Sequence, residues 1–293
     1  MTSQRERSME GKVVVLTGAS NGIGLATARS IASLGAETVM LARDPQRGEA
    51  ARAEVMTAAD NDAVSLLLCD FADLACVRDV ADEIRARWER VDVLCDNAGA
   101  ILRERIITAE GCELTMQTNH FAHFLLTLRL EPALRAAGSA RVVVVSSDAH
   151  LAALQGIPFD DLTFERGWSP FRAYSVSKLA NIMFAYELAR RWTDVGIAVN
   201  AMHPGLVRTG FGAGRWGLGG SVFSALSRQW ALEAEEGADT EVFLATSPDV
   251  QGVTGRYFYR RKPKRSSPVS YDTDAQQRLW EVSERLVAGY LRS

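Results

Sequence analysis

Short apolar runs alternate with longer helix-like stretches along the chain, and this alternation limits the fold more than any other feature of the sequence. Several runs are apolar at consecutive positions, as expected for strands that are buried on both faces of a parallel sheet. Seven runs are predicted as strands, at residues 12–16, 37–41, 64–69, 91–95, 141–146, 197–202 and 255–258. Helical patterns occur at 23–34, 47–58, 74–90, 113–137, 171–194, 235–245 and 274–291. This order predicts an α/β fold, a doubly wound parallel β-sheet flanked by helices.

We expect one domain over residues 11–293, preceded by a flexible polar lead at 1–10. The 293 residues are 47% hydrophobic, enough for one large α/β core, and neither a linker nor an internal repeat divides them. Two stretches break the alternation, an insertion at 151–170 and a Gly-rich stretch at 207–230. Both follow predicted strand ends, where ligands bind in such folds. The first is a candidate pocket wall and the second a small substrate lid, with ordinary surface loops as the alternative.

Composition excludes several classes of partner. The formal charge is 33 − 36 = −3, so nothing favours nucleic acid or an anionic membrane. No signal peptide, membrane anchor or run of about 18 apolar residues is found. The cysteines and histidines show no metal-ligand spacing, and most of the cysteines lie in or beside apolar runs, as buried free thiols would in a reducing compartment. These features predict a cytoplasmic protein without a metal site.

A Gly-rich turn, TGASNGIG, follows the first predicted strand and opens the first helix. Gly18 suits the tight turn, while Gly22 and Gly24 let the backbone approach a diphosphate and the helix approach the sheet. The helix N-terminus adds free amides and partial positive charge. The position between strand and helix favours dinucleotide binding over the alternative, a plain turn.

The end of the second predicted strand bears on the choice of cofactor. Many NAD sites place an acid there for the ribose hydroxyls. Here Ala42 holds that position and Arg43 follows, and a guanidinium suits a 2′-phosphate. Asp44 weakens this argument, and Arg43 has the alternative role of a surface residue capping a turn. We therefore favour NADP(H), with NAD(H) as the alternative.

Tyr174 and Lys178 are four residues apart in a predicted helix, so their side chains share one face. A phenol normally titrates near pH ~10, and a neighbouring ammonium lowers that pKa. The pair is therefore a candidate general acid/base. Its alternative is an exposed helix face on which the two residues meet by chance.

The motifs TGASNGIG, DNAG (96–99) and YSVSK (174–178), in this order, resemble those of the short-chain dehydrogenase/reductase family. The resemblance spans residues 11–291 and implies a single-domain Rossmann-type fold. It is closest to the retinol dehydrogenase-like branch and its bacterial relatives. The local runs that carry this second resemblance are TNHFAHFLLT, VSSDAH, SKLANIMFAYELARR, HPGLVRT and RLWEVSE.

The resemblance implies four catalytic residues. Tyr174 would donate the proton as hydride reaches the carbonyl carbon, and Lys178 would lower its pKa and bind the nicotinamide ribose. Ser147 would polarise the substrate carbonyl, with Ser146 as the alternative. Asn119 would hold a water that passes protons to Lys178.

The resemblance also implies a set of cofactor contacts. Asp70 would accept a hydrogen bond from the adenine amine, with a helix N-cap as its alternative role. Residues after the sixth strand would meet the nicotinamide carboxamide. The full set is Gly18, Ser20, Asn21, Gly22, Ile23, Gly24, Arg43, Asp70, Phe71, Asn97, Ala98, Gly99, Tyr174, Lys178, Pro204, Gly205, Val207 and Thr209.

Two departures from the family pattern are informative. Asp96 replaces the Asn usual in the first position of its motif, which changes the local polarity. Ser147 and Tyr174 are 174 − 147 = 27 positions apart, more than the family's usual dozen or so, and the retinol dehydrogenase-like branch carries a similar insertion. The spacing therefore supports the branch.

The predicted function is an NADPH-dependent carbonyl reductase that interconverts an alcohol and a ketone or aldehyde on a hydrophobic small molecule. His150, Phe159, Trp168 and Phe171 are candidates for an apolar pocket, with core packing as the alternative. Two other functions stay open: an epimerase or dehydratase that uses bound cofactor, and a catalytically silent NADP-sensing protein. The resemblance adds an expected homodimer or homotetramer through helices 113–137 and 171–194.

Overall fold

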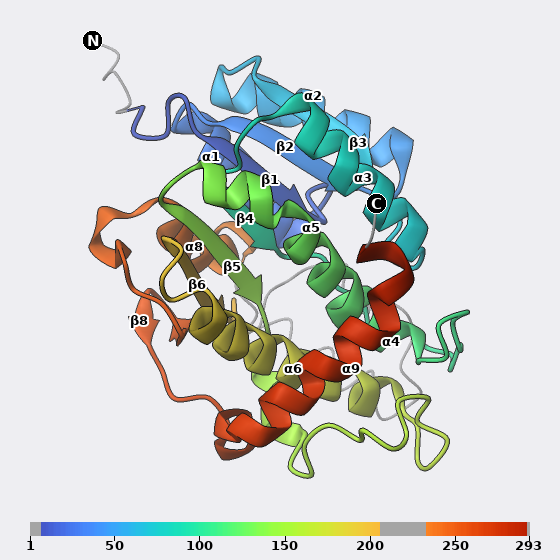
Figure 1. The fold of residues 1–293 in the computed structure, drawn as a ribbon. Helices are drawn as coiled ribbons and strands as arrows, with labels where there is room; N and C mark the ends of the chain where they lie inside the picture. The colour runs from blue at the N-terminus through green and yellow to red at the C-terminus, as the bar shows by residue number, and fades with distance from the viewer. Residues whose placement is uncertain (1–6, 206–232, 292–293) are drawn as a thin grey trace.

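The apolar runs assemble into one eight-stranded sheet in a computed structural model that describes residues 7–205 and 233–291 (Figure 1). The strand order is β3-β2-β1-β4-β5-β6-β7-β8, and every pair is parallel except β7 with β8. The doubly wound fold is confirmed. The strands are β1 (Val13–Thr17), β2 (Glu37–Ala42), β3 (Val64–Leu68), β4 (Val93–Asp96), β5 (Ala140–Val145), β6 (Ile197–Met202), β7 (Arg256–Tyr259) and β8 (Lys262–Pro263).

Helices cover both faces of the sheet. One face packs against α1 (Gly22–Ser33), α2 (Pro45–Ala59) and α8 (Ala234–Thr246). The other packs against α3 (Leu74–Arg87), α5 (Ala122–Ala136) and α6 (Pro170–Arg191). Helix α9 (Thr273–Leu291) then runs diagonally across α5 and α6 (Figure 1).

Alternation of side chains along each strand explains why the strands are apolar throughout. In β1, Val13 and Val15 enter the core under α3, α5 and α6, while Val14 and Leu16 enter the core under α1, α2 and α8. Strands β2, β4 and β5 divide their side chains in the same way. Each fully buried Val or Leu contributes about 1.5–3 kcal/mol to stability, so the sheet is held from both sides.

Capping residues set where the helices begin. Asp44 accepts a hydrogen bond from the backbone of Arg47 at 2.9 Å and starts α2. Ser169 does the same for α6 through the backbone of Arg172, at 3.1 Å. A proline follows each cap, where its missing N–H costs nothing. Two predicted helices therefore begin slightly earlier than their apolar patterns indicate.

Two predicted elements differ from the structure. The helix predicted at 113–137 is divided into α4 (Leu114–Met116), a π-helical turn (Gln117–Phe121) and α5. An apolar pattern does not reveal the extra residue of a π-turn, because both faces of this segment are buried. Strand β8 was not predicted, since it has two residues, one of them proline, and follows a turn in which Arg260 and Arg261 take positive φ angles of 49° and 59°.

The structure describes the irregular stretches and the N-terminal lead to different extents. Within 151–170, Ile157 and Phe164 are buried in the main core, so this insertion packs onto the domain. The candidate lid at 207–230 lies outside the described residues. Of the lead, residues 7–10 are described, and Met9 is buried and bonded to the carbonyl of Leu34.

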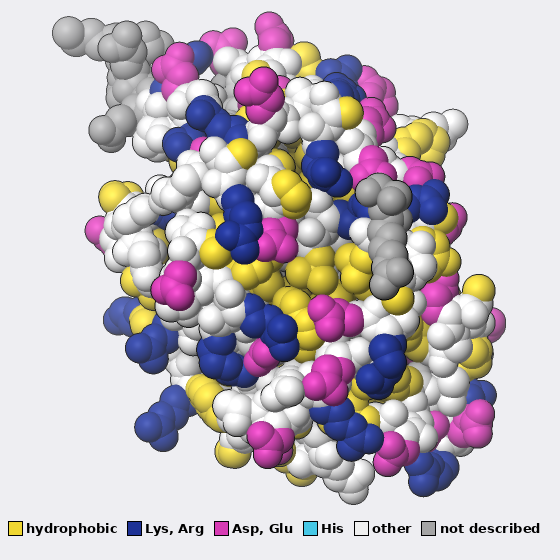
Figure 2. Space-filling model, viewed as in Figure 1, with side chains coloured by type: hydrophobic (Ala, Val, Ile, Leu, Met, Phe, Trp, Pro, Cys, Tyr) yellow, Lys and Arg dark blue, Asp and Glu magenta, His cyan; other side chains and the backbone are white. Residues whose placement is uncertain are grey.

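Surface charge and cysteine burial agree with the compositional argument. On the face in Figure 2, Lys and Arg side chains are interspersed with Asp and Glu. Cys69, Cys95 and Cys112 are buried, Cys76 is partly buried, and all four are free thiols. No helix in the described part of the chain is long and apolar enough to span a bilayer.

Trp280 fixes α9 to the domain, which gives a stability prediction. Its ring lies 4.9 Å from Phe124 and 6.2 Å from Phe184, between ring centroids, and the Arg191 guanidinium lies 4.1 Å above it. Trp280→Ala should lower the free energy of unfolding by about 3–5 kcal/mol, because it leaves a cavity among these rings. Urea denaturation followed by circular dichroism measures this loss.

Gln277→Ala is the matched control on the exposed face of α9, with an expected change within about 0.5 kcal/mol. Equal midpoints for the Trp280 variant and the wild type would contradict the anchoring role.

Candidate active site

The two turns that carry the family-like motifs meet where the strand order reverses. Strands β1 and β4 are neighbours at the centre of the sheet, and the Gly-rich turn and the segment 97–99 leave their carboxyl ends. The hydroxyl of Thr17 accepts the backbone N–H groups of Asn97 and Ala98 at 2.9 and 2.8 Å. The Asn97 side-chain amide donates to the Thr17 carbonyl at 2.8 Å. Ligands of open α/β sheets bind in the crevice at such a switch point.

Glycine is required where these turns approach each other. Gly18 has φ +68°, and a Cβ there would lie 2.9 Å from Cα of Ala98. A Cβ on Gly24 would lie 2.3 Å from the Gly18 carbonyl oxygen and 2.6 Å from the amide nitrogen of Asn97. All three distances are inside van der Waals contact. The close approach of helix to turn, expected for a dinucleotide site, is therefore present.

The start of α1 leaves its amides available. Asn21 is the exposed N-cap residue and its side chain makes no capping bond. Ser20, Gly22 and Ile23 are partly exposed beside it. Unpaired N–H groups and the helix dipole make such a terminus suited to an anion.

The end of β2 separates the roles of its two charged residues. Asp44 caps α2 and pairs with Arg47, Nε to Oδ2 at 3.3 Å. Arg43 is exposed, and no ion pair involves it in the described structure. The carboxylate of Asp44, which weakens the case for NADP(H), is thus bonded within its own helix, α2.

The other residues predicted to contact the cofactor differ in burial and in hydrogen bonding. Asp70 accepts a hydrogen bond from the backbone of Ala72 at 3.0 Å, whereas Asp73 is the N-cap of α3. The Phe71 side chain is buried and lies 4.7 Å from the ring of His123. Pro204 and Gly205 follow β6 and are partly exposed. Val207 and Thr209 lie outside the described residues.

Ser147, Tyr174 and Lys178 converge between β5 and α6. The Ser147 hydroxyl makes a hydrogen bond with the Tyr174 phenol. The Lys178 ammonium lies 5.8 Å from the centre of the Tyr174 ring and donates to the Val145 carbonyl at 3.0 Å. Ser146 is buried and donates to the carbonyl of Lys178 at 2.7 Å. Of the two serines, Ser147 is the one that faces the phenol.

The protonation states differ from the expectation that Lys178 lowers the pKa of Tyr174. Burial raises the pKa of Tyr174 to about 12, and the hydrogen bond from Ser147 opposes this only in part. Burial lowers the pKa of Lys178 to about 8, with the Glu241 carboxyl acting in the opposite direction. At neutral pH the phenol is therefore protonated, as a proton donor must be.

Asn119 lies in the π-helical turn, and its side chain is fully engaged. The amide oxygen accepts from the backbone of Ala100 at 2.8 Å, and the amide nitrogen donates to the Ala100 carbonyl and to Ser177, both at 2.9 Å. Gly99 leaves room beside it, because a Cβ there would lie 3.2 Å from the Lys178 ammonium. Asn119 thus ties the turn after β4 to the helix that carries Lys178.

Two buried carboxyls lie near the site; the sequence marked Asp96 only as a departure from its motif and did not single out Glu241. Glu241 of α8 accepts from Thr27 at 2.8 Å, and burial raises its pKa to about 7. Asp96 at the end of β4 accepts from Thr127 at 2.9 Å, its other oxygen has no partner among the described residues, and burial raises its pKa to about 8. The departure of Asp96 from its motif was the one signal available. Glu241 gives no comparable signal, because α8 contains several other acidic residues.

The aromatic residues proposed for an apolar pocket are dispersed. His150 is buried, and Trp168 is partly buried and donates to Glu113 at 3.2 Å. Phe159 is partly buried under the Arg278 guanidinium, while Phe171 is 49% exposed. These positions agree with the packing alternative for His150 and Trp168.

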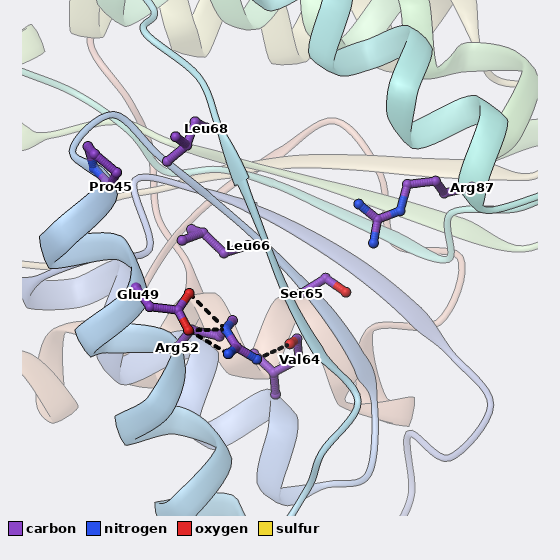
Figure 3. A pocket seen from close by; sticks show the side chains of 8 residues that line it. All are labelled: Pro45, Glu49, Arg52, Val64, Ser65, Leu66, Leu68 and Arg87. Atoms are coloured by element: carbon purple, nitrogen blue, oxygen red, sulfur yellow. Dashed lines mark hydrogen bonds and ion pairs between the residues drawn. The ribbon is translucent and has the colours of Figure 1, made fainter.

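A separate surface hollow lies beside the edge strand β3 (Figure 3). The paired side chains of Glu49 and Arg52 form one wall of it, and none of the candidate catalytic residues lines it. Among the described residues, no group of His, Cys, Asp and Glu is placed to hold a metal ion.

The chain has extensive similarity to known enzymes. A family model described as enoyl-(acyl carrier protein) reductase matches residues 18–260. Retinol dehydrogenase 14 of Homo sapiens is 39% identical over 294 residues, which cover 95% of this chain and 87% of the relative. The chain belongs to the short-chain dehydrogenase/reductase family. It lies in the retinol dehydrogenase-like branch and is an NAD(P)-dependent oxidoreductase acting on CH–OH groups.

Two further relatives agree with this membership. The "Putative daunorubicin C-13 ketoreductase DnrU" of Streptomyces sp. (strain C5) is 40% identical over 288 residues, covering 97% of this chain and 95% of the relative. The crystal structure of an uncharacterised protein from Mycobacterium paratuberculosis is similar with a TM-score of 0.77 at 33% identity, covering 95% and 94% of the two chains. The single-domain Rossmann-type fold of this family member is thereby shown.

Asp96 should make stability fall as pH rises. Its folded-state pKa, about 8, exceeds the ordinary value of 3.8, so the folded state binds more protons in between and loses stability over that window. Asp96→Asn removes this proton. The free energy of unfolding should then fall less steeply between pH 5 and 7, by about 1.4 kcal/mol per pH unit.

Urea titrations at pH 5, 6 and 7 measure this slope, with Asp62→Asn at an exposed carboxyl as the control. Identical slopes for the Asp96 variant and the wild type would show that Asp96 is ionised in the fold.

Proposed function

We propose that this enzyme is an NADPH-dependent carbonyl reductase for hydrophobic small molecules. The convergence of Ser147 on the protonated phenol of Tyr174, beside Lys178, is the observation that carries the proposal. NADPH, when bound, supplies the hydride. Ser147 donates a hydrogen bond to the substrate carbonyl oxygen, and Tyr174 donates the proton that turns this oxygen into a hydroxyl.

The Tyr174 phenol is protonated at neutral pH, which is the form that proton donation in a reduction requires. A phenol with a pKa of about 12 holds its proton at neutral pH, and reduction consumes a proton at the carbonyl oxygen. Oxidation would need the phenolate, which Lys178 stabilises when its ammonium is charged. The resting protonation state is thus the one required for proton donation to a ketone or aldehyde.

The preference for NADP(H) over NAD(H) rests on Arg43. Its exposed guanidinium follows β2, the strand whose end is next to the ribose in such folds, and its neighbour Asp44 is engaged with Arg47. A charge-assisted pair with a 2′-phosphate would give this guanidinium a partner. The Gly-rich turn and the free N-terminus of α1 are suited to the diphosphate.

The substrate class follows from the relatives' names. One relative is called a retinol dehydrogenase and another a C-13 ketoreductase for daunorubicin, so apolar alcohols and ketones are the compounds to test first. A homodimer or homotetramer through α5 and α6, and a cytoplasmic location, are further proposals. Free cysteines support the second.

Tyr174→Phe should abolish turnover because it removes the proton donor and keeps the ring. NADPH consumption, followed at 340 nm over a panel of apolar ketones and aldehydes, should fall at least about a thousandfold, within the range of general acid catalysis. NADPH should still bind, as measured by quenching of protein fluorescence. Undiminished turnover by the variant would rule out Tyr174 as the donor.

Net NADPH consumption by the wild type also separates a reductase from an epimerase or dehydratase, which returns its cofactor unchanged.

Arg43→Ala should weaken NADPH binding by about 10- to 100-fold, since a hydrogen bond to a charged group contributes about 1.5–3 kcal/mol. NADH lacks the 2′-phosphate, so its affinity should change little. Arg47→Ala is the control, because that side chain pairs with Asp44. Equal losses for NADPH and NADH would exclude a 2′-phosphate contact.

A further inference from the structure

The residue after the candidate substrate anchor Ser147 is held by three donors from distant parts of the chain. One oxygen of the Asp148 carboxylate lies 3.2 Å from Nε2 of His203, 3.1 Å from the Lys264 ammonium and 3.4 Å from the Tyr257 hydroxyl. These donors come from the end of β6, the segment after β8, and β7. Asp148 and His203 lie in two of the runs that resemble the family, but the proposed proton transfer does not use this cluster.

Three contacts bear on the tautomer of His203, because its Nε2 lies 3.4 Å from the Lys264 ammonium as well as 3.2 Å from Asp148. Nδ1 of His203 accepts the backbone N–H of Gly205 at 3.2 Å, so in the neutral ring the proton lies on Nε2. That Nε2–H points to Asp148. Burial lowers the pKa of His203 to about 4, and the facing Lys264 acts in the same direction, so the ring is neutral at pH 7. A single side chain thus joins the turn after β5 to the turn after β6.

His150 holds the same turn from its other side. Its Nδ1 donates to the Ser147 carbonyl at 2.6 Å, and its Nε2 accepts the backbone N–H of Ser267 at 3.0 Å. The side chains of His150 and His203 are both almost fully buried, on either side of Tyr257. Two neutral histidines therefore bind Ser147 and Asp148, and a backbone N–H fixes the orientation of each imidazole ring.

The geometry points to a new role for His203, which we propose as a positioning residue of the reduction. Its contact with Asp148 fixes the turn that carries Ser147, and its contact with Gly205 fixes the turn expected at the nicotinamide. The two turns are thereby held as one unit. This proposal rests on the proposed reductase function. Stacking of the His203 ring on Tyr259, 4.2 Å between centroids, is the competing explanation, in which the residue only fills space.

Two substitutions separate the contacts of His203. In His203→Asn the side-chain oxygen occupies the place of Nδ1 and can keep the Gly205 contact, but the side chain is too short for Asp148. In His203→Gln the longer amide can donate to Asp148 but leaves the Gly205 N–H unpaired. Both variants lose the ring, so a purely packing role predicts the same effect for both.

The kinetic parameters of the two variants should therefore diverge. His203→Asn should lower kcat for a ketone substrate about tenfold or more and leave the Kd for NADPH within about twofold. His203→Gln should raise the Kd for NADPH about tenfold and lower kcat less. Kd comes from fluorescence titration, which needs no turnover, and kcat from NADPH consumption. Equal changes in kcat and Kd for the two variants would overturn the proposal.

A double-mutant cycle gives a test that does not require large changes in the core. Asp148 is exposed, and Asp148→Ala removes the acceptor of the His203 contact without opening a cavity in the core. If His203 acts through Asp148, the loss in kcat for His203→Asn combined with Asp148→Ala should be no larger than the larger of the two single losses. Additive losses would overturn the proposal.

Lys262→Ala, on β8 beside the cluster, is the matched control and should leave kcat and Kd unchanged. Thermal unfolding by circular dichroism confirms that each variant is folded. An inactive wild type would refute the reductase function, whereas an active wild type with unaffected His203 and Asp148 variants would refute the positioning role alone.

Discussion

The hydroxyl of Thr17 joins the two halves of the site. It accepts the amides of Asn97 and Ala98, and it lies 3.0 Å from Nε2 of His123. Because Nδ1 of His123 can only donate to the Asn119 carbonyl, Nε2 is the acceptor and the Thr17 hydroxyl donates to it. One hydroxyl therefore connects the Gly-rich turn, the turn after β4 and the π-helical turn that carries Asn119. The close packing at Gly18 and Gly24 depends on this connection.

Much of the fold could be predicted because its signals are local. A strand that is buried on both faces must be apolar at every position, whereas a helix needs an apolar residue only at every third or fourth position. A run such as Val13 to Leu16 therefore indicates a strand rather than a helix. The π-turn at Asn119 and the two-residue β8 are invisible at this level. The π-turn bonds to distant residues, as Asn119 does to Ser177 and His120 to Ser283. Strand β8 follows turn residues, Arg260 and Arg261, that rarely favour positive φ.

The candidate site could be predicted where the proposed chemistry requires a particular residue type. It could not be predicted where burial determines whether a side chain is charged. Motif spacing led to Tyr174, Lys178 and Ser147. The raised pKa of Tyr174 and the buried carboxyls Asp96 and Glu241 arise from three-dimensional burial, which no linear pattern encodes. The four histidines illustrate this limit, since all are buried, and burial lowers the pKa of each.

Strand β7 and the segment after β8 make contacts that fix the Ser147 turn, and these contacts have a consequence for biosynthesis. The strands β1 to β5, with the Gly-rich turn, leave the ribosome long before Lys264 and Ser267 are made. A nascent chain can therefore assemble the cofactor half of the sheet while the catalytic turn still lacks the partners that fix it. The candidate catalytic turn is then among the last parts of the fold to acquire its contacts during synthesis.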